Sequence, residues 1–146
     1  IGIINGKIIN CDRKYDGDVY IKDGKIISIN DKSDIAYNKS DHIINAKRII
    51  NGESKYIIPG GIDPHTHMQL PFMGEIAVDD FNYGTRAALS GGTTMFIDFI
   101  IPDKSNNESL IDAYKKWRNW ADKKVNIDYG LHAAITHFDD RVYKDM

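Results

Sequence analysis

The sequence predicts an α/β chain, with a small all-β module over residues 1–58 followed by three partial βα units of a parallel sheet over residues 59–146. Three observations lead to this prediction. Asn-Gly and Asp-Gly pairs lie between isoleucine-rich runs in the first 58 residues, β-type and helix-type segments alternate after residue 57, and residues 93–101 are almost continuously apolar. Such a run is typical of a strand buried on both faces, and the β-α-β-α-β order is typical of parallel strands joined by crossover helices.

The all-β module contains three hairpin candidates. Asn-Gly and Asp-Gly tolerate the positive φ angles of a type I′ turn, so each pair predicts a turn between two short strands. The candidates span residues 3–9, 20–27 and 49–58, with turns at Asn5-Gly6, Asp23-Gly24 and Asn51-Gly52. A module this thin needs a second layer to be stable.

The second part begins with a strand that ends at His65-Thr66-His67. A helix follows from Asp79-Asp80, with Ser90-Gly91-Gly92 at its end because glycine suits the left-handed residue after a helix. Its buried face is predicted to hold Phe81, Thr85, Ala88 and Leu89. After the strand at 93–101, Asn106 or Asn107 is expected to cap a second helix with a buried stripe of Leu110, Tyr114, Trp117 and Ala121.

A third strand is predicted over residues 127–136, and the polar stretch after it indicates the start of another helix. Three such units bury little apolar surface by themselves. They suit either half of a doubly wound sheet or the opening third of a barrel. The sequence starts at Ile1 without an initiator Met and stops at Met146 in that polar stretch, so we expect both ends to be cut.

Charge and cysteine content exclude several classes of function. With 19 basic and 21 acidic residues and a net charge of −2, the chain has no excess of Lys and Arg for nucleic acid or a membrane surface. No apolar run approaches the about 20 residues that span a bilayer, and the start does not resemble a signal peptide. The lone Cys11 forms no internal disulfide. We therefore expect a cytosolic chain.

The outstanding candidate site is His65-Thr66-His67. Side chains two apart on a strand point to the same face, so both imidazoles are expected to project together from the strand's carboxyl end. That end is where α/β barrels place their active sites, and two neutral imidazoles make half of a Zn²⁺ site. Asp63, two residues earlier, is a candidate to orient a ligand. A chance His-x-His without a metal role is the alternative.

Other candidates are weaker. His132 is predicted to be a hydrogen-bonded core histidine, and Asp98 either supports a metal ligand or is a structural acceptor. Residues 68–74 form either a loop that packs on the rim or a pocket wall. We expect solvated side chains at His42 and His137, and helix-to-sheet packing at Trp117 and Trp120. The sequence has no glycine-rich phosphate loop, nucleophile elbow or cysteine pair.

These segments together resemble the dihydropyrimidinase family. The central motif is residues 59–74, which contains the two histidines and Leu70-Pro71-Phe72-Met73-Gly74. Further segments that match are Asp79-Asp80-Phe81, residues 84–95, Ile97-Asp98, residues 117–122 and residues 128–132. The resemblance covers most of the chain, and its central motif is long and specific.

The resemblance implies a metal-dependent amidohydrolase, whose (β/α)₈ TIM barrel carries a side β-sandwich built from both chain termini. It implies that His65 and His67 bind one zinc ion. A carboxylated lysine, two more histidines and an aspartate would complete a two-zinc site. By family order these partners lie beyond Met146, and the tyrosine that stabilises the oxyanion is also absent from this stretch. No catalytic residue is therefore assigned within the chain. A homotetramer is implied.

The implied reaction is the hydrolytic ring opening of 5,6-dihydrouracil, dihydrothymine or a hydantoin to an N-carbamoyl amino acid, in reductive pyrimidine catabolism. A zinc-activated hydroxide would attack the ring carbonyl. Dihydroorotases resemble this motif but carry an arginine where Gln69 stands. A neutral amide lacks that charged fork, so a substrate without a carboxylate is favoured, with Leu70 and Phe72 against the ring.

Three alternatives remain. Non-catalytic dihydropyrimidinase-related cytoskeletal or signalling proteins share the fold but lack metal-ligand histidines, and allantoinase is another cyclic amidase. A stand-alone binding module would leave barrel strand edges unpaired. In isolation, residues 1–146 are expected to bind zinc weakly and to be inactive, because two histidines leave a metal under-coordinated.

Overall fold

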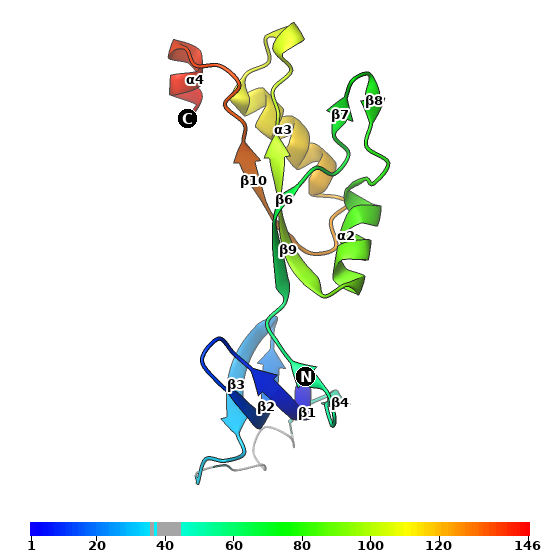
Figure 1. Cartoon of the computed structure of the whole chain (residues 1–146), viewed down its shortest axis with the longest axis vertical. Coiled ribbons are helices and arrows are strands. Elements are labelled where there is room, and N and C mark those ends of the chain that lie inside the picture. The colour runs from blue at the N-terminus through cyan, green and yellow to red at the C-terminus, as the bar shows by residue number, and fades with distance from the viewer. Residues whose placement is uncertain (36, 38–44) are drawn as a thin grey trace. The chain divides into compact units, whose positions relative to one another are not determined.

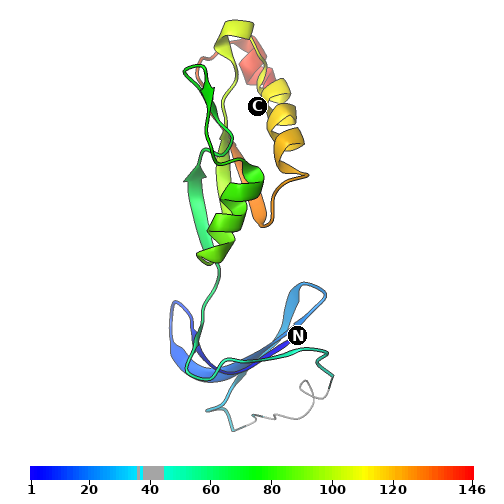
Figure 2. The ribbon, with the colours of Figure 1, turned by 90° about the vertical axis from the view of Figure 1, so that its right-hand side faces the viewer.

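The structure is a computed structural model that describes residues 1–35, 37 and 45–146. His42, expected to be solvated, lies outside the described residues. The described residues form two compact units, Ile1–Pro59 and Gly60–Met146 (Figure 1). The first contains strands, and the second combines strands with helices, as the view in Figure 2 also shows.

The first unit is a single sheet. Its strands are β1 (Gly2–Ile9), β2 (Lys14–Lys22), β3 (Lys25–Asp31), β4 (Ile49–Asn51) and β5 (Tyr56–Ile57). Their order is β3-β2-β1-β4, and β5 also pairs with β1. The β1–β2 and β2–β3 pairs are antiparallel, whereas β4 and β5 run parallel to β1.

Only one of the three predicted hairpins is present. Asp23 and Gly24 have φ angles of 51° and 74° and connect β2 to β3, with Lys22 paired to Lys25. The hairpin predicted at Asn5-Gly6 is wrong, because β1 runs straight through this pair. Asn5 takes a φ of 62° inside a bulge, where the register with β2 shifts. The same tolerance of positive φ that favours a turn here serves a bulge.

The hairpin predicted at Asn51-Gly52 is also wrong. β4 and β5 do not pair with each other, since each pairs with β1. The Gly52 N–H donates to the Ile4 carbonyl at 2.7 Å. A Cβ on Gly52 would lie 3.1 Å from the Gly6 Cα and 3.2 Å from the Ile4 oxygen, so this glycine serves close backbone approach.

The second unit contains a parallel sheet of order β10-β9-β6. Its strands are β6 (Gly61–Thr66), β9 (Thr93–Ile100) and β10 (Asp128–Ala133), and β7 (Pro71–Phe72) and β8 (Glu75–Ile76) form a separate hairpin. The helices are α2 (Phe81–Ser90), α3 (Leu110–Ala121) and α4 (Asp140–Asp145), with a 3₁₀ turn, η1, at Lys104–Asn106. The predicted alternation of strands and helices is confirmed. No helix in the described ranges is long and apolar enough to cross a membrane.

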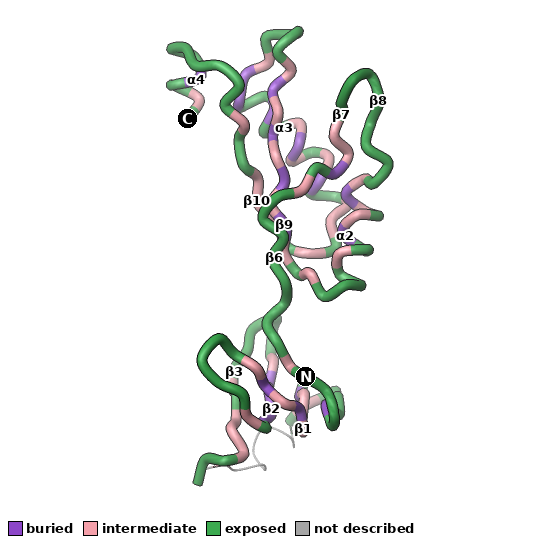
Figure 3. The backbone as a smooth tube through the Cα atoms, viewed as in Figure 1, coloured by how far each residue is buried: buried purple, intermediate pink, exposed green. Residues whose placement is uncertain are grey.

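One face of this sheet is buried under α2 and α3. Phe96 and Ile100 of β9 pack with Phe81, Ala113 and Trp117 of the helices, and Figure 3 shows buried positions along β9 and α3. Trp117 is confirmed as a packing residue, with Trp120 against it at a ring-centroid distance of 4.9 Å. β9 alternates between buried and partly exposed residues, so it is buried on one face rather than on two.

The helix ends agree in part with the sequence. The helix predicted to begin at Asp79-Asp80 is present as α2, and Asp80 caps it by accepting from the N–H groups of Asn82 and Tyr83. The cap predicted for α3 at Asn106 or Asn107 is wrong. Asn107 ends η1 in the left-handed region, and Ser109 caps α3.

Tyr114 was predicted in the buried stripe but is exposed, because Ala113 faces the core in its place.

A buried carboxylate holds the bulge in β1. Asp18 of β2 is fully buried, and it accepts hydrogen bonds from the Asn5 N–H at 2.8 Å and from the Tyr37 hydroxyl at 2.7 Å. The Lys32 Nζ lies 3.9 Å from the same carboxylate. Burial, with the hydrogen bond to Asp18, raises the pKa of Tyr37 to about 12. Asp18 therefore satisfies the donor that the irregular strand leaves unpaired.

Replacing Asp18 with Ala should loosen this sheet. The variant leaves the Asn5 N–H without its acceptor, which we expect to cost about 2–3 kcal/mol of local unfolding free energy. Native-state hydrogen exchange of the β1 and β2 amides measures this. Asp16→Ala is the control, because its ion pair with Lys7 is exposed and is worth at most about 1 kcal/mol. Equal effects of the two substitutions would refute the role of Asp18.

Candidate metal centre

Two histidines converge at the carboxyl end of β6. His65 is the next-to-last residue of the strand and His67 directly follows its end, and both are exposed. Their Nε2 atoms are 3.2 Å apart. The ring centroids are 5.0 Å apart, with the planes at 83°. The two imidazoles thus project together, as the two-residue spacing predicted.

The separation of these nitrogens suits a shared metal ion. Two nitrogens at about 2.0–2.1 Å from a tetrahedral Zn²⁺ lie about 3.3–3.4 Å from each other. The observed 3.2 Å is close to this value, and it also allows one neutral imidazole to donate to the other. In the part of the chain that the structure describes, no group of three or more His, Cys, Asp or Glu side chains is arranged to hold a metal ion. The pair offers two nitrogen donors at a spacing that suits one ion.

An aromatic ring lies against both imidazoles. The Phe99 ring centroid is 4.4 Å from that of His65 and 5.4 Å from that of His67. Phe99 follows the buried Asp98 on β9, so strand alternation turns it to the face opposite the helices. Sequence reasoning missed it, although this alternation was the available signal. Phe99 restricts how the two imidazoles can rotate.

The prediction for His132 is wrong. His132 is exposed rather than part of the core. The β9–β10 register pairs it with Phe99, and the two ring centroids are 5.1 Å apart. Because paired residues of neighbouring strands share a face, His132 lies on the side of the sheet that carries the two histidines and not on the side covered by α2 and α3.

Asp98 acts as a buried acceptor. It is fully buried, and its carboxylate accepts from the Met68 N–H at 2.7 Å, the Phe99 N–H at 2.6 Å and the Thr66 hydroxyl at 3.3 Å. Burial raises the pKa of Asp98, against the opposing effect of these hydrogen bonds and of nearby His67. Of its two predicted roles, the contacts favour the structural one, because they fix the backbone on either side of His67.

Asp63 contacts the backbone of the histidine strand. Its Oδ1 accepts from the His65 N–H at 3.1 Å. A register shift between Asp63 and Thr66 interrupts the alternation of β6, so the two-residue spacing from Asp63 to His65 does not ensure a common face. Asp63 shapes the end of the strand.

His137, expected to be solvated, is exposed and lies 3.8 Å from the Asp139 carboxylate.

The segment after the histidines forms the β7–β8 hairpin, with its turn at Met73-Gly74 in positive-φ conformations. Leu70 and Phe72 line a cavity of about 600 Å³ with residues of α3, and His65 and His67 are not among its lining residues.

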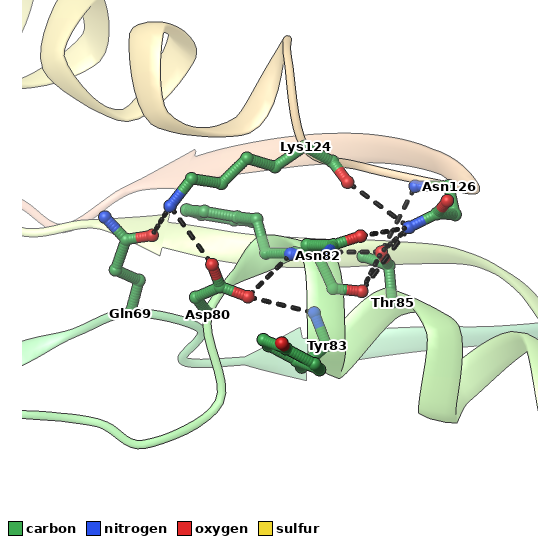
Figure 4. Close-up of polar contacts among 8 residues, drawn as sticks. Gln69, Asp80, Asn82, Tyr83, Thr85, Lys124 and Asn126 are labelled. Atoms are coloured by element: carbon green, nitrogen blue, oxygen red, sulfur yellow. Dashed lines mark hydrogen bonds and ion pairs between the residues drawn. The ribbon is translucent and has the colours of Figure 1, made fainter.

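The Gln69 amide is turned to Lys124 (Figure 4), with the Lys124 Nζ 2.7 Å from Oε1. Lys124 was also missed, because it lies in a polar stretch without a motif.

Comparison with known proteins places this geometry in context. Residues 56–130, about half of the chain, match the Amidohydrolase family. The chain is 50% identical over 144 residues to dihydropyrimidinase 2 of Caenorhabditis briggsae, covering 99% of this chain and 26% of the relative. It is 42% identical over 144 residues to the human dihydropyrimidinase-related protein 5, covering 99% of this chain and 24% of that protein. The chain thus spans about a quarter of the length of these relatives.

A solved structure matches as well. The dihydropyrimidinase of Brevibacillus agri superposes with a TM-score of 0.83 at 36% identity, over 99% of this chain and 29% of that one. The fold class is therefore confirmed: the chain corresponds to part of a TIM barrel and part of a β-sandwich. The other arrangement left open by the sequence, half of a doubly wound sheet, is excluded.

Removing the Asp98 carboxylate should free the backbone beside the histidines. In Asp98→Ala, the buried Met68 N–H has lost its acceptor, which costs about 1–3 kcal/mol. The exchange of the Met68 amide should speed up by about tenfold or more, as measured by hydrogen exchange. Asp128→Ala on the neighbouring strand is the control, since Asp128 is exposed. An unchanged Met68 amide in Asp98→Ala would contradict this role.

Proposed function

The chain belongs to the amidohydrolase family, as its motifs indicated, and from this premise we propose that the complete protein is a dihydropyrimidinase-like cyclic amidase. It opens 5,6-dihydrouracil, dihydrothymine or a hydantoin by hydrolysis to an N-carbamoyl amino acid, in reductive pyrimidine catabolism. The observation that carries the proposal is the approach of the His65 and His67 Nε2 atoms to 3.2 Å. The named dihydropyrimidinase relative and structural neighbour support the substrate class.

In this proposal His65 and His67 hold zinc through Nε2. Bound zinc supplies a water of lowered pKa and polarises the ring carbonyl. Phe99 keeps the two imidazoles side by side, and Asp98 holds the backbone that carries them. The complete protein would hold a second zinc ion. The carboxylated lysine, the remaining ligands and the oxyanion donor would be residues outside this chain.

The substrate is proposed to be a ring without a carboxylate. Gln69 provides no charged fork for one, and its amide oxygen is already bound by Lys124. Leu70 directly precedes β7, and Phe72 lies in it, in the segment that follows the histidine strand. We propose that these two apolar side chains face C5 or C6 of the ring in the complete active site.

A second candidate function comes from the match to dihydropyrimidinase-related protein 5, since a non-catalytic cytoskeletal or signalling role is the alternative to catalysis. The presence and convergence of both histidines favours the enzyme. Allantoin is an alternative cyclic amide. The zinc content of the complete protein separates the catalytic from the non-catalytic function.

The wider organisation is proposed on the same basis. Residues 1–58 would supply strands of the β-sandwich, and residues 59–146 the first three βα units of the barrel. The complete protein is proposed to be a cytosolic homotetramer that needs neither nucleic acid nor a membrane. The near balance of 19 basic and 21 acidic residues supports that last point.

Replacing either metal histidine tests the proposed function. His65→Ala and His67→Ala should each lower zinc content and reduce 5,6-dihydrouracil hydrolysis by at least about 100-fold. Even the loss of a residue that only hydrogen-bonds to a metal ligand lowers metal affinity or activity by about 10–100-fold. Metal analysis and release of the N-carbamoyl product measure the two effects. His137→Ala is the control, because this histidine is exposed and its recorded ionic neighbour is Asp139. Full zinc and turnover in His65→Ala would refute the site.

Arginine substitutions beside and within the β7–β8 hairpin test the proposed pocket. Leu70→Arg and Phe72→Arg in the complete protein should each change the ratio of kcat/KM for 5,6-dihydrouracil and dihydrothymine by about tenfold, since one methyl group in an apolar pocket is worth this much. Val78→Arg serves as the control, because Val78 is 96% exposed in the same connection. An unchanged ratio in both variants would remove Leu70 and Phe72 from the substrate pocket.

A further inference from the structure

Lys124 connects two segments that lie far apart in the sequence. It stands in the loop between α3 and β10, and its Nζ donates to the Gln69 Oε1 at 2.7 Å and to the Asp80 Oδ2 at 3.1 Å (Figure 4). Gln69 is two residues beyond His67, and Asp80 is the cap of α2. One ammonium group therefore joins the exit of the histidine strand to the start of the next helix.

Gln69 needs such a contact because of its backbone. Its φ of 54° lies in the left-handed region, which costs a non-glycine residue conformational free energy and persists only when its surroundings hold it. Two interactions hold Gln69: its N–H donates to the Asp79 carbonyl at 2.8 Å, and its side chain accepts from Lys124. The first anchors the backbone and the second anchors the amide.

Lys124 is itself held in place. The Asp80 Oδ1 accepts from the α2 N–H groups of Asn82 and Tyr83, which leaves Oδ2 to face the ammonium. Close by, the Asn126 N–H donates to the Thr85 Oγ1 at 3.1 Å, and its Nδ2 to the Asn82 Oδ1 at 3.2 Å. The α3–β10 loop is thus fastened to the first turns of α2 at two points, as Figure 4 shows.

We propose that Lys124 is a positioning residue for the metal centre: it holds the left-handed turn at Gln69 that leaves the histidine strand, and it restricts position 69 to neutral or acidic side chains. A glutamate there would gain an ion pair. A cation there would stand against the Lys124 ammonium at hydrogen-bond distance, where like charges repel. Lys124, which belongs to a later βα unit, therefore disfavours a cation at position 69 separately from any effect of the substrate.

The catalytic consequence of this inference rests on the proposed function, whereas the structural part does not. If the turn at Gln69 loosens, the backbone between His67 and the β7–β8 hairpin becomes less restrained. Turnover then falls even though both imidazoles are present. Orientation at a reacting centre is sensitive to such shifts. The test therefore needs a readout of the backbone that is independent of substrate.

Hydrogen exchange on the complete, zinc-loaded protein supplies this readout. In Lys124→Met we expect the hydrogen-bonded amides within residues 69–79, those of Gln69 and Ala77 above all, to exchange about tenfold faster, the size of change that loss of one charged hydrogen bond produces. The control is Lys123→Met, because Lys123 is exposed, and it should leave these amides unchanged. Gln69→Leu, which removes only the acceptor, should match Lys124→Met, so it replaces that variant should Lys124→Met fail to fold. Unchanged exchange in Gln69→Leu overturns the proposal.

Charge at position 69 gives a second, independent measurement. Gln69→Glu should preserve slow exchange, because the carboxylate still accepts from Lys124, and Gln69→Arg should accelerate exchange by about tenfold or more. In the double variant Gln69→Arg with Lys124→Met, the arginine should cause much less additional damage, because its repelling partner is gone. Additive effects would overturn the restriction on position 69.

The outcomes separate the two proposals. A wild-type protein that opens no cyclic amide removes the proposed function, while the exchange rates of residues 69–79 still decide the role of Lys124. A wild-type protein that turns over dihydrouracil, with exchange and kcat unaffected by Lys124→Met and Gln69→Leu, removes the positioning role alone.

Discussion

The candidate site depends on the buried carboxylate of Asp98. A pair of imidazoles at a strand end can bind one ion only if the backbone beneath them is held, and this strand end is irregular, with a register shift between Asp63 and Thr66. Asp98 accepts from the Thr66 hydroxyl and the Met68 N–H, on either side of His67. An unpaired N–H at this buried position would be costly, so the carboxylate supplies the acceptor that the regular ladder does not.

The same device occurs in the first unit. Asp18 is also fully buried, and it accepts from the Asn5 N–H at the bulge of β1. In both sheets a central strand therefore carries an aspartate that faces an irregularity in its neighbour. The two sites differ in what surrounds them. Asp18 has the Lys32 ammonium at 3.9 Å, whereas Asp98 lies near His67; burial raises the pKa of Asp98, and its hydrogen bonds and His67 oppose that effect.

The proposed metal site lies on the face of the parallel sheet that the helices leave open. His65, His67 and His132 all lie around Phe99 on this face, while Phe96, Asp98 and Ile100 are buried on the other. Such a division suits a barrel, in which helices cover the outside and the site lies at the carboxyl ends of the strands. The similarity to the dihydropyrimidinase of Brevibacillus agri agrees with this arrangement.

The sequence by itself determined the order of strands and helices in the second unit, the family and the convergence of His65 and His67, because these depend on local periodicity and on a contiguous motif. It did not determine whether Asn5-Gly6 and Asn51-Gly52 form turns, since Asn5 uses its positive φ in a bulge and Gly52 serves close backbone approach instead. The exposure of His132, the ring of Phe99 beside the imidazoles and the contact of Lys124 with Gln69 were decided by tertiary structure. Each depends on which residues distant in sequence meet across strands and loops, and pairing of that kind leaves no periodic signal along the chain.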